Sequence, residues 1–439
     1  MKNRISRREL LRSTAMVSGA WLSSGPLLRA QTKSANEKLN IAAIGVGGRG
    51  AADVGGVAGE NIVALCDVDE KRAAKTFARF SNARRFKDYR RMFDQMHREI
   101  DAVVIGTPDH THAAIAVTAM KLGKHCYCEK PLSHSVFEAR TMSNVAKEGR
   151  LVTQMGTQIH AGDNYRRVVE LIKTNAIGPV REVHVWLGAK FSGPPRPTNS
   201  SQRNAPSDKP PVPRGLDWDL WLGPAEFRPY HPWYAPGGWR YWWNFANGTL
   251  GDFFCHYCDL PFWALNLKHP VTVEAKGSLH AESTSHRTIA RQEYAARGAL
   301  PPVALTWYHG GGYPALMKEH TIPQWKNAVL FVGSEGMLIA DYGRHLLLPE
   351  DKFTGFERPD PFIPASIGHH REWVEACKTG GPTTCDFDYG GALTEAALLS
   401  NVALRTGRKL TWDAKALKAV GCPEADALIR REYRQGWTL

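Results

Sequence analysis

The sequence predicts a two-domain α/β protein that begins with a doubly wound parallel sheet. Between Lys38 and Pro131, short apolar strand-like runs alternate with helical stretches, which is the pattern of a parallel sheet. A glycine-rich turn, Gly45–Gly50, follows the first apolar run and opens a helix. The chain has 439 residues, and at roughly 100–200 residues per domain the natural expectation is two domains.

The elements of the first domain follow one another closely. We expect strands at the apolar runs 39–44, 61–66, 101–106 and 125–128, and helices at 71–79 and 112–122. Farther along the chain, we expect alternating strands over 271–343, helices over 366–379 and 393–406, and a turn over 386–391.

The turn Gly45–Gly50 has the G-x-G-x-x-G spacing of dinucleotide-binding domains. The first glycine permits the tight turn, the second lets the backbone approach a pyrophosphate, and the third lets helix and strand pack closely. Asp67 ends the second strand about 20 residues later, where a carboxylate accepts hydrogen bonds from the adenine-ribose hydroxyls and repels a 2′-phosphate. We therefore expect NAD as the cofactor, with NADP kept as the alternative because Arg72 lies nearby.

The net charge of +13 does not indicate nucleic-acid binding. Residues 1–30 hold six basic residues and one glutamate, so +8 remains when they are left out. The remaining basic residues are scattered, and no basic stripe or nucleic-acid motif accompanies them.

Residues 1–30 are expected to be a signal peptide. Arg7 and Arg8 come before two leucines, and a short apolar run over 15–22 leads to small residues and a cleavage point near Ala30. The run is too short to span a bilayer. The paired arginines resemble a twin-arginine export signal, which predicts a periplasmic or otherwise exported protein. Because that pathway moves folded proteins, a cofactor would bind in the cytoplasm and travel with the protein.

The motif Glu129-Lys130-Pro131 follows the last strand of the first domain. Together with Gly45–Gly50, Thr107-Pro108 and His112, it resembles the Gfo/Idh/MocA oxidoreductases. Two further stretches resemble that family's second-domain markers, Asn175–Val180 and Gly333–Gly336.

The resemblance implies a particular division of the chain. A Rossmann domain over 38–157 would precede a substrate-binding and oligomerisation domain over 158–439, built on a large, mostly antiparallel open sheet. An open sheet needs covering, so a homodimer or homotetramer is expected.

The resemblance also implies a set of cofactor-binding residues. They are Gly45, Gly47, Gly48, Arg49, Gly50, Asp67, Thr107, Pro108, His112, Glu129 and Lys130. In that family the lysine of the E-K-P motif is catalytic, and Lys130 occupies the matching position. A lysine at the carboxyl end of a parallel strand faces the ligand crevice, and its cation can polarise a hydroxyl or carbonyl oxygen.

Asp252, His256 and Asp259 are spaced i, i+4, i+7, which places them on one face of a helix. A histidine held by a carboxylate accepts protons well near neutral pH. From the residues alone, a polar pair at a helix surface fits this spacing equally well. The resemblance implies that His256 is the general base, that Asp252 orients it or binds substrate, and that Asp259 is a supporting carboxylate of the substrate site.

Aromatic residues crowd together before that helix. They are Trp218, Trp221, Tyr230, Trp233, Tyr234, Trp239, Tyr241, Trp242 and Trp243. We expect most of them to serve packing and Arg240 to contact the substrate, because an arginine among rings that stack on sugars can hold a hydroxyl or carboxylate. The proline-rich segment 192–215 is expected to be a long loop or arm.

The chain has eight cysteines, including a C-x-x-C pair at Cys255 and Cys258. Zinc sites usually show two such pairs at short spacing, so we expect no metal. Some cysteines can pair in an oxidising compartment, and the sequence leaves their pairing open.

These patterns predict an exported NAD-dependent enzyme that oxidises a secondary hydroxyl of a sugar, polyol or glycoside, with a tightly bound cofactor recycled in place. One alternative is a redox-neutral glycosidase or lyase that acts through a keto-sugar, which we rank lower because the family's glycosidases lack the E-K-P motif. Another is a non-catalytic sugar-binding protein, against which stand Lys130, Asp252 and His256. Neither a membrane span nor a nucleic-acid partner is expected.

Overall fold

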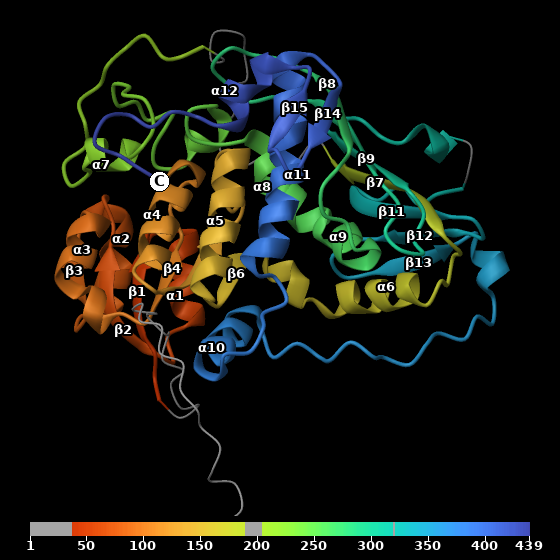
Figure 1. The fold of residues 1–439 in the computed structure, drawn as a ribbon, viewed down its shortest axis with the longest axis horizontal. Helices are drawn as coiled ribbons and strands as arrows, with labels where there is room; N and C mark the ends of the chain where they lie inside the picture. The colour runs from red at the N-terminus through yellow and green to blue at the C-terminus, as the bar shows by residue number, and fades with distance from the viewer. Residues whose placement is uncertain (1–36, 189–203, 319–320) are drawn as a thin grey trace, which may run out of the picture.

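A computed structural model describes residues 37–188, 204–318 and 321–439. The expected signal peptide and residues 192–203 of the proline-rich arm lie outside the described residues. The described chain forms two sheets that lie side by side, with long helices between them (Figure 1). The fold class expected from the sequence is confirmed: the first sheet has six parallel strands, and the second has nine strands that pair mostly antiparallel.

The strands of the first sheet lie in the order β3-β2-β1-β4-β5-β6. Its strands are β1 (Asn40–Ile44), β2 (Asn61–Cys66), β3 (Arg84–Phe86), β4 (Ala102–Ile105), β5 (His125–Glu129) and β6 (Thr153–Gly156). Its helices are α1 (Arg49–Gly56), α2 (Glu70–Arg79), α3 (Tyr89–Met96), α4 (Asp109–Lys121) and α5 (Val136–Gly149). The chain reverses direction across the sheet between β1 and β4, and such a switch point is where doubly wound sheets bind ligands.

Strand β1 shows why this sheet needs helices on both faces. Ile41 and Ala43 pack into the cluster that contains side chains of α1 and α2. Ala42 and Ile44 pack into the cluster that contains side chains of α3, α4 and α5. Because both faces are buried, the strand is a continuous apolar run, as the sequence showed.

The second sheet has the order β13-β12-β11-β7-β10-β9-β8-β14-β15. Its strands are β7 (Val180–Leu187), β8 (Thr272–Gly277), β9 (Thr288–Tyr294), β10 (Val303–His309), β11 (Asn327–Gly333), β12 (Met337–Ala340), β13 (His345–Leu348), β14 (Leu410–Asp413) and β15 (Lys418–Val420). The helices in this half are α6 (Asp163–Lys173), α7 (Trp218–Leu222), α8 (Gly248–Tyr257), α9 (Asp259–Leu265), α10 (His369–Thr379), α11 (Phe387–Thr406) and α12 (Asp426–Ile429).

Helix α10 belongs by sequence to the second half of the chain, yet it packs on the first sheet. Trp373, Val374 and Cys377 lie in the same buried cluster as Leu39 and Ile41 (Figure 1). The segment assigned from sequence to the substrate domain therefore returns to cover one face of the Rossmann sheet.

The turn expected over residues 386–391 is wrong, because α11 begins at Phe387. Asp386 caps this helix by accepting hydrogen bonds from the backbone N–H groups of Asp388 and Tyr389. Gly390 and Gly391, which fall within the expected turn, lie inside the helix, where a Cβ on Gly390 would come within 2.9 Å of the Cβ of Met155. Close packing against β6 therefore explains the glycine.

Among the described residues, the search for a helix long and apolar enough to cross a membrane found none.

Candidate active site

A single cleft runs along the carboxyl ends of β1, β2, β4 and β5 and is closed on its far side by residues of the second half of the chain. It encloses about 1530 Å³, counting its open mouth. One end is lined by Gly45, Gly47 and Asp67, and the other by Lys130 and Asp252. The position at the strand switch point is the one expected of a dinucleotide site.

The glycine turn is built for a phosphate group. Gly45 has a φ of +76°, and a Cβ there would come within 2.6 Å of Thr107. A Cβ on Gly50 would come within 1.8 Å of the carbonyl oxygen of Gly45, so α1 and β1 can approach only at glycine. Gly48, the residue before α1, makes no side-chain cap, which leaves the first N–H groups of the helix for an anion.

Asp67 holds this turn in place from the end of β2. Its Oδ2 accepts hydrogen bonds from the N–H groups of Val46 at 2.8 Å and Gly47 at 3.2 Å, and its Oδ1 accepts one from Asp69 at 2.9 Å. Burial raises the pKa of Asp67, while these hydrogen bonds act to lower it. Together with the glycine turn, this carboxylate at the adenosine end fits NAD.

Of the other predicted cofactor residues, Thr107 and Pro108 line the cleft, but His112 does not. His112 is buried beneath the loops, with its ring nitrogens 2.9 Å from the carbonyl oxygen of Pro131 and 2.7 Å from that of Thr107. Its expected contact with the cofactor is therefore corrected: it ties the loop after β4 to the loop after β5. Helix α4 is buried along almost its whole length, which places this side chain inside.

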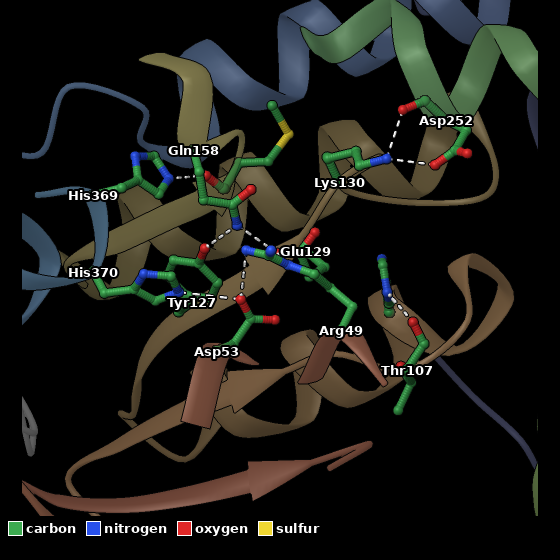
Figure 2. A network of polar contacts seen from close by, with 12 residues as sticks. Arg49, Asp53, Thr107, Tyr127, Glu129, Lys130, Gln158, Asp252, His369 and His370 are labelled. Atoms are coloured by element: carbon green, nitrogen blue, oxygen red, sulfur yellow. Dashed lines mark hydrogen bonds and ion pairs between the residues drawn. The ribbon is translucent and has the colours of Figure 1, made fainter. Parts of the chain in front are cut away.

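Arg49 and Glu129 both line the cleft and are paired with each other (Figure 2). The Nε of Arg49 lies 3.0 Å from Glu129, and its Nη2 lies 3.0 Å from Asp53. Gln158 donates a 2.6 Å hydrogen bond to Glu129 and a 2.7 Å hydrogen bond to the Tyr127 hydroxyl. Burial and the nearby Asp53 raise the pKa of Glu129 to about 7, against the opposing charge of Arg49.

The far end of the cleft joins the two halves of the chain. Lys130, directly after β5, donates hydrogen bonds of 2.5 Å to Oδ1 and 2.6 Å to the backbone oxygen of Asp252 on α8 (Figure 2). Arg240 places its Nε 3.6 Å from the other carboxylate oxygen and stacks over the ring of Trp239 at 4.2 Å. Although burial alone would raise it, the pKa of Asp252 is lowered because Lys130 and Arg240 stabilise its charge.

His256 lies one helical turn beyond Asp252 and lines the same cleft. Burial, followed by the cation of Lys130, lowers its pKa to about 3, so the ring is neutral near pH 7. Among the described residues no hydrogen bond joins it to Asp252, and its Nδ1 has no partner. The expectation that Asp252 orients His256 is therefore corrected, since Lys130 and Arg240 engage that carboxylate.

Asp259 does not belong to this site, which corrects its predicted role. Helix α8 ends at Tyr257 and a new helix, α9, begins at Asp259, so the i, i+7 relation to Asp252 is broken. The buried Asp259 carboxylate accepts hydrogen bonds from His160 at 2.8 Å and from the Tyr389 hydroxyl at 2.7 Å. Through these hydrogen bonds, Asp259 links α9 to His160 and to α11 in the core behind the cleft.

Most of the aromatic residues before α8 pack against one another, as expected. Trp218, Tyr230, Tyr234 and Trp242 are buried in one cluster with Phe245. Two rings of this stretch, Trp221 and Trp239, also line the cleft beside Arg240.

Sequence reasoning missed several residues that line the cleft. They include Asp109, Gln158, Leu220, Pro236 and Trp437. Asp109 carried a usable signal, because it directly follows Thr107-Pro108 at the end of β4. Trp437 carried none, since nothing near the C-terminus indicates that it lies beside Tyr89 and under Arg90.

All eight cysteines are buried and unpaired, and none lies in the cleft except Cys66. Within the described ranges, ligand atoms of His160, Asp259 and Cys385 lie within 4.8 Å of one another. The C-x-x-C pair, Cys255 and Cys258, takes no part in that group.

The parallel sheet has a glycine turn at its switch point, and one cleft joins Asp67 at the end of β2 to Lys130 after β5. This is the arrangement of nucleotide-dependent oxidoreductases. Two family models match the chain: "Oxidoreductase family, NAD-binding Rossmann fold" over residues 39–157, and "Oxidoreductase family, C-terminal alpha/beta domain" over residues 200–300. The matches together span half of the chain, and it belongs to the Gfo/Idh/MocA oxidoreductase family, whose first domain binds NAD.

Curated relatives match only part of the chain. An inositol 2-dehydrogenase of Rubrobacter xylanophilus is 32% identical over 149 residues, which cover 33% of this chain and 42% of that protein. A levoglucosan dehydrogenase of Pseudarthrobacter phenanthrenivorans is 33% identical over 103 residues, which cover 24% of each. The matched region therefore spans less than half the length of these relatives.

Solved structures share the fold over most of the chain. GenD2 from gentamicin A biosynthesis, solved in complex with NAD, has a TM-score of 0.58 at 19% identity, with 88% of this chain and 99% of that one covered. An aldose-aldose oxidoreductase from Caulobacter crescentus, solved with glycerol, has a TM-score of 0.56 at 16% identity, with 86% and 100% covered.

Proposed function

We propose that this protein is an NAD-dependent dehydrogenase that oxidises a secondary hydroxyl of a sugar, polyol or glycoside. The observation that carries the proposal is the 2.5 Å contact between Lys130 and Asp252, which brings both halves of the chain together at one end of the dinucleotide cleft. The relatives named inositol 2-dehydrogenase and levoglucosan dehydrogenase support a polyhydroxylated substrate.

Different residues of the cleft are proposed to bind the cofactor and to act on the substrate. Gly45 and Gly47 would hold the pyrophosphate of NAD and Asp67 its adenine ribose. Bound there, NAD⁺ would supply the hydride acceptor for the alcohol carbon. The cation of Lys130 polarises the substrate oxygen and stabilises its developing negative charge. The neutral ring of His256, which lines the same end of the cleft, accepts the hydroxyl proton as negative charge develops on the substrate oxygen.

Oxidation of a panel of sugars tests this function directly. We expect NADH absorbance to rise when the purified protein is given NAD⁺ with myo-inositol, levoglucosan or methyl β-D-glucopyranoside. The Lys130→Ala protein should lose this activity while still binding NADH. Undiminished turnover by that variant would overturn the assignment, and sugar release with no net change in NADH would favour the redox-neutral glycosidase.

We further infer that the protein is exported and carries its cofactor with it. The inference rests on Arg7-Arg8 and the apolar run that follows them, in a part of the chain outside the described residues. Mass spectrometry of protein purified from the periplasm without added nucleotide should find bound NAD. An empty site, or protein confined to the cytoplasm, would contradict it.

We also infer a homo-oligomer. The nine-stranded sheet ends in two edge strands, β13 and β15, and exposes apolar side chains such as Ile289, which is 37% exposed. Light scattering should report a mass of two or four chains, and a monomer at micromolar concentration would contradict this inference.

A further inference from the structure

Helix α10 places a histidine directly behind the wall of the cleft. His370, the second residue of α10, contacts α1 of the Rossmann domain. Its Nε2 lies 3.1 Å from Oδ1 of Asp53, whose side chain is fully buried. His370 does not line the cleft itself, so it has no part in the function proposed above.

The first connection from His370 to the cleft runs through Asp53. Oδ1 of Asp53 lies 3.0 Å from Nη2 of Arg49, and Nε of Arg49 lies 3.0 Å from Glu129 (Figure 2). Arg49 and Glu129 both line the cleft. An ionised carboxylate only accepts hydrogen bonds, so the imidazole and the guanidinium both donate to it. Among the described residues Oδ2 of Asp53 has no partner, and one oxygen therefore makes both contacts.

The second connection runs through Tyr127 of β5. The ring of His370 stacks on that of Tyr127, with centroids 4.9 Å apart and an angle of 21° between the ring planes. The Tyr127 hydroxyl accepts a 2.7 Å hydrogen bond from Gln158, which also donates one of 2.6 Å to Glu129. Both connections therefore end at Glu129, the residue that directly precedes Lys130.

Helix α1 leaves room for the histidine ring because residue 56 is a glycine. A Cβ on Gly56 would come within 2.6 Å of Cγ and 2.8 Å of Nδ1 of His370. A Cβ on the neighbouring Gly55 would meet nothing closer than Nη1 of Arg79, at 3.4 Å. A substitution at Gly56 can therefore displace the ring without changing His370, and Gly55 offers the matched control.

We propose that His370 is a positioning residue for the nicotinamide half of NAD. It fixes the paired side chains of Arg49 and Glu129, which line the cleft. The proposal rests on the cofactor placement proposed above, with the adenosine at Asp67 and the nicotinamide toward the opposite end of the cleft. Helix α10, which belongs by sequence to the second half of the chain, thereby contributes to cofactor binding.

The physical reason is that a side chain held in its binding orientation loses less rotamer entropy when the ligand arrives. Arg49 has more N–H donors than the two that Asp53 and Glu129 engage, so further donors remain for the cofactor. Without His370, the buried carboxylate of Asp53 would keep a single donor, and the guanidinium of Arg49 would no longer be fixed from behind.

The test measures the affinity of the full chain for NADH and for 5′-AMP. Because AMP carries only the adenosine half of the cofactor, it occupies only the end of the cleft at Asp67. The variants are His370→Ala, Gly56→Ala and His370→Gln, whose amide N–H can replace the imidazole N–H toward Asp53. Gly55→Ala is the control, and thermal unfolding of every variant identifies a folding defect.

We expect His370→Ala and Gly56→Ala to weaken NADH binding about 10-fold and AMP binding by less than about twofold. His370→Gln and Gly55→Ala should stay within about threefold of wild type for both ligands. The proposal is wrong if either of the first two variants binds NADH as tightly as wild type, or loses NADH and AMP affinity equally. A glutamine variant as impaired as the alanine variant contradicts it as well.

Steady-state kinetics separate this role from the proposed function. With a panel sugar that is oxidised, His370→Ala should raise KM for NAD⁺ about 10-fold and change kcat by less than about threefold, because Lys130 and His256 are untouched. A fall in kcat at unchanged KM would overturn the proposal. If no sugar is oxidised but the binding pattern holds, the proposed function fails and the role of His370 stands. If wild type binds no NADH, the cofactor placement fails, and this proposal with it.

Discussion

Asp252 and Asp259 are seven residues apart, and each holds a nitrogen-bearing side chain, yet they serve different purposes. Asp252 is 23% exposed on the cleft and pairs with Lys130 across the two halves of the chain. Asp259 is fully buried and pairs with His160, a ring stacked on Trp263 at 4.1 Å. The comparison shows that accessibility distinguishes the two carboxylates: Asp252 can be reached by a substrate, whereas Asp259 only stabilises the packing of the core.

The energetics of the two pairs should differ accordingly. Water and substrate can reach Lys130 and Asp252, so losing either partner leaves a charge that can be solvated. Water cannot reach His160 or Asp259. If one of them is removed, the other stays buried without a partner, and the folded state is destabilised by the full desolvation free energy of that group. Activity should therefore depend on the first pair and stability on the second.

The largest expected effect is on activity, at the partly exposed pair of Lys130 and Asp252 in the cleft. Lys130→Ala should lower kcat by about 1000-fold, because the cation that stabilises developing charge on the substrate oxygen is lost. NADH formation measures the loss. Urea unfolding serves as the control and should change by less than about 1 kcal/mol; a much larger loss of stability would assign Lys130 a structural role as well.

His256→Ala should lower kcat by about 100-fold, since a positioned proton acceptor contributes on that order. His160→Ala is its matched partner and should leave kcat per folded molecule within about threefold, because its ring lies outside the cleft. Single-turnover measurements with both variants check this contrast. Equal losses of kcat would break the comparison.

Asp259→Ala should destabilise the fold by about 3 kcal/mol, because two hydrogen bonds from His160 and Tyr389 lose their acceptor inside the core. Chemical unfolding followed by tryptophan fluorescence measures the change. Asp94→Ala, at an exposed position, should stay within about 0.5 kcal/mol. A change as small for Asp259→Ala would contradict the bracing role.

The smallest expected effect concerns Glu129. This carboxyl lines the cleft, as Asp252 does, but it is buried, as Asp259 is. Its pKa is raised to about 7 in the folded protein, above its unfolded value. The folded state therefore holds this proton more tightly, and the associated stability is lost as pH rises toward 7, by at most about 1.4 kcal/mol per pH unit. Glu129→Gln should flatten that slope in urea unfolding measured from pH 5 to 8. If the dependence of the unfolding free energy on pH were unchanged in Glu129→Gln, another group would be responsible for it.

Local patterns were enough to predict the first domain and half of the site. The strands of the Rossmann sheet are apolar runs because both faces are buried, and Gly45–Gly50 is required by contacts that a Cβ would block. The second half of the site was harder to predict from the sequence, because its residues lie on helices whose ends the sequence pattern did not reveal. The helix break at Cys258 places Asp259 outside the site, and most of the segment expected to be a turn, residues 387–391, lies inside α11.

By itself, the sequence determined which chemistry the chain carries: a phosphate-binding turn, an acidic residue for the ribose, and Lys130 at the end of a strand. Only the tertiary structure decided which side chains meet there. Lys130 and Asp252 lie far apart in the sequence, and the pKa of Asp252 is lowered because folding places Lys130 beside it in one cleft. The physical reason is that a backbone turn is fixed by local sterics, whereas a carboxyl's ionisation depends on burial and on neighbours that folding supplies.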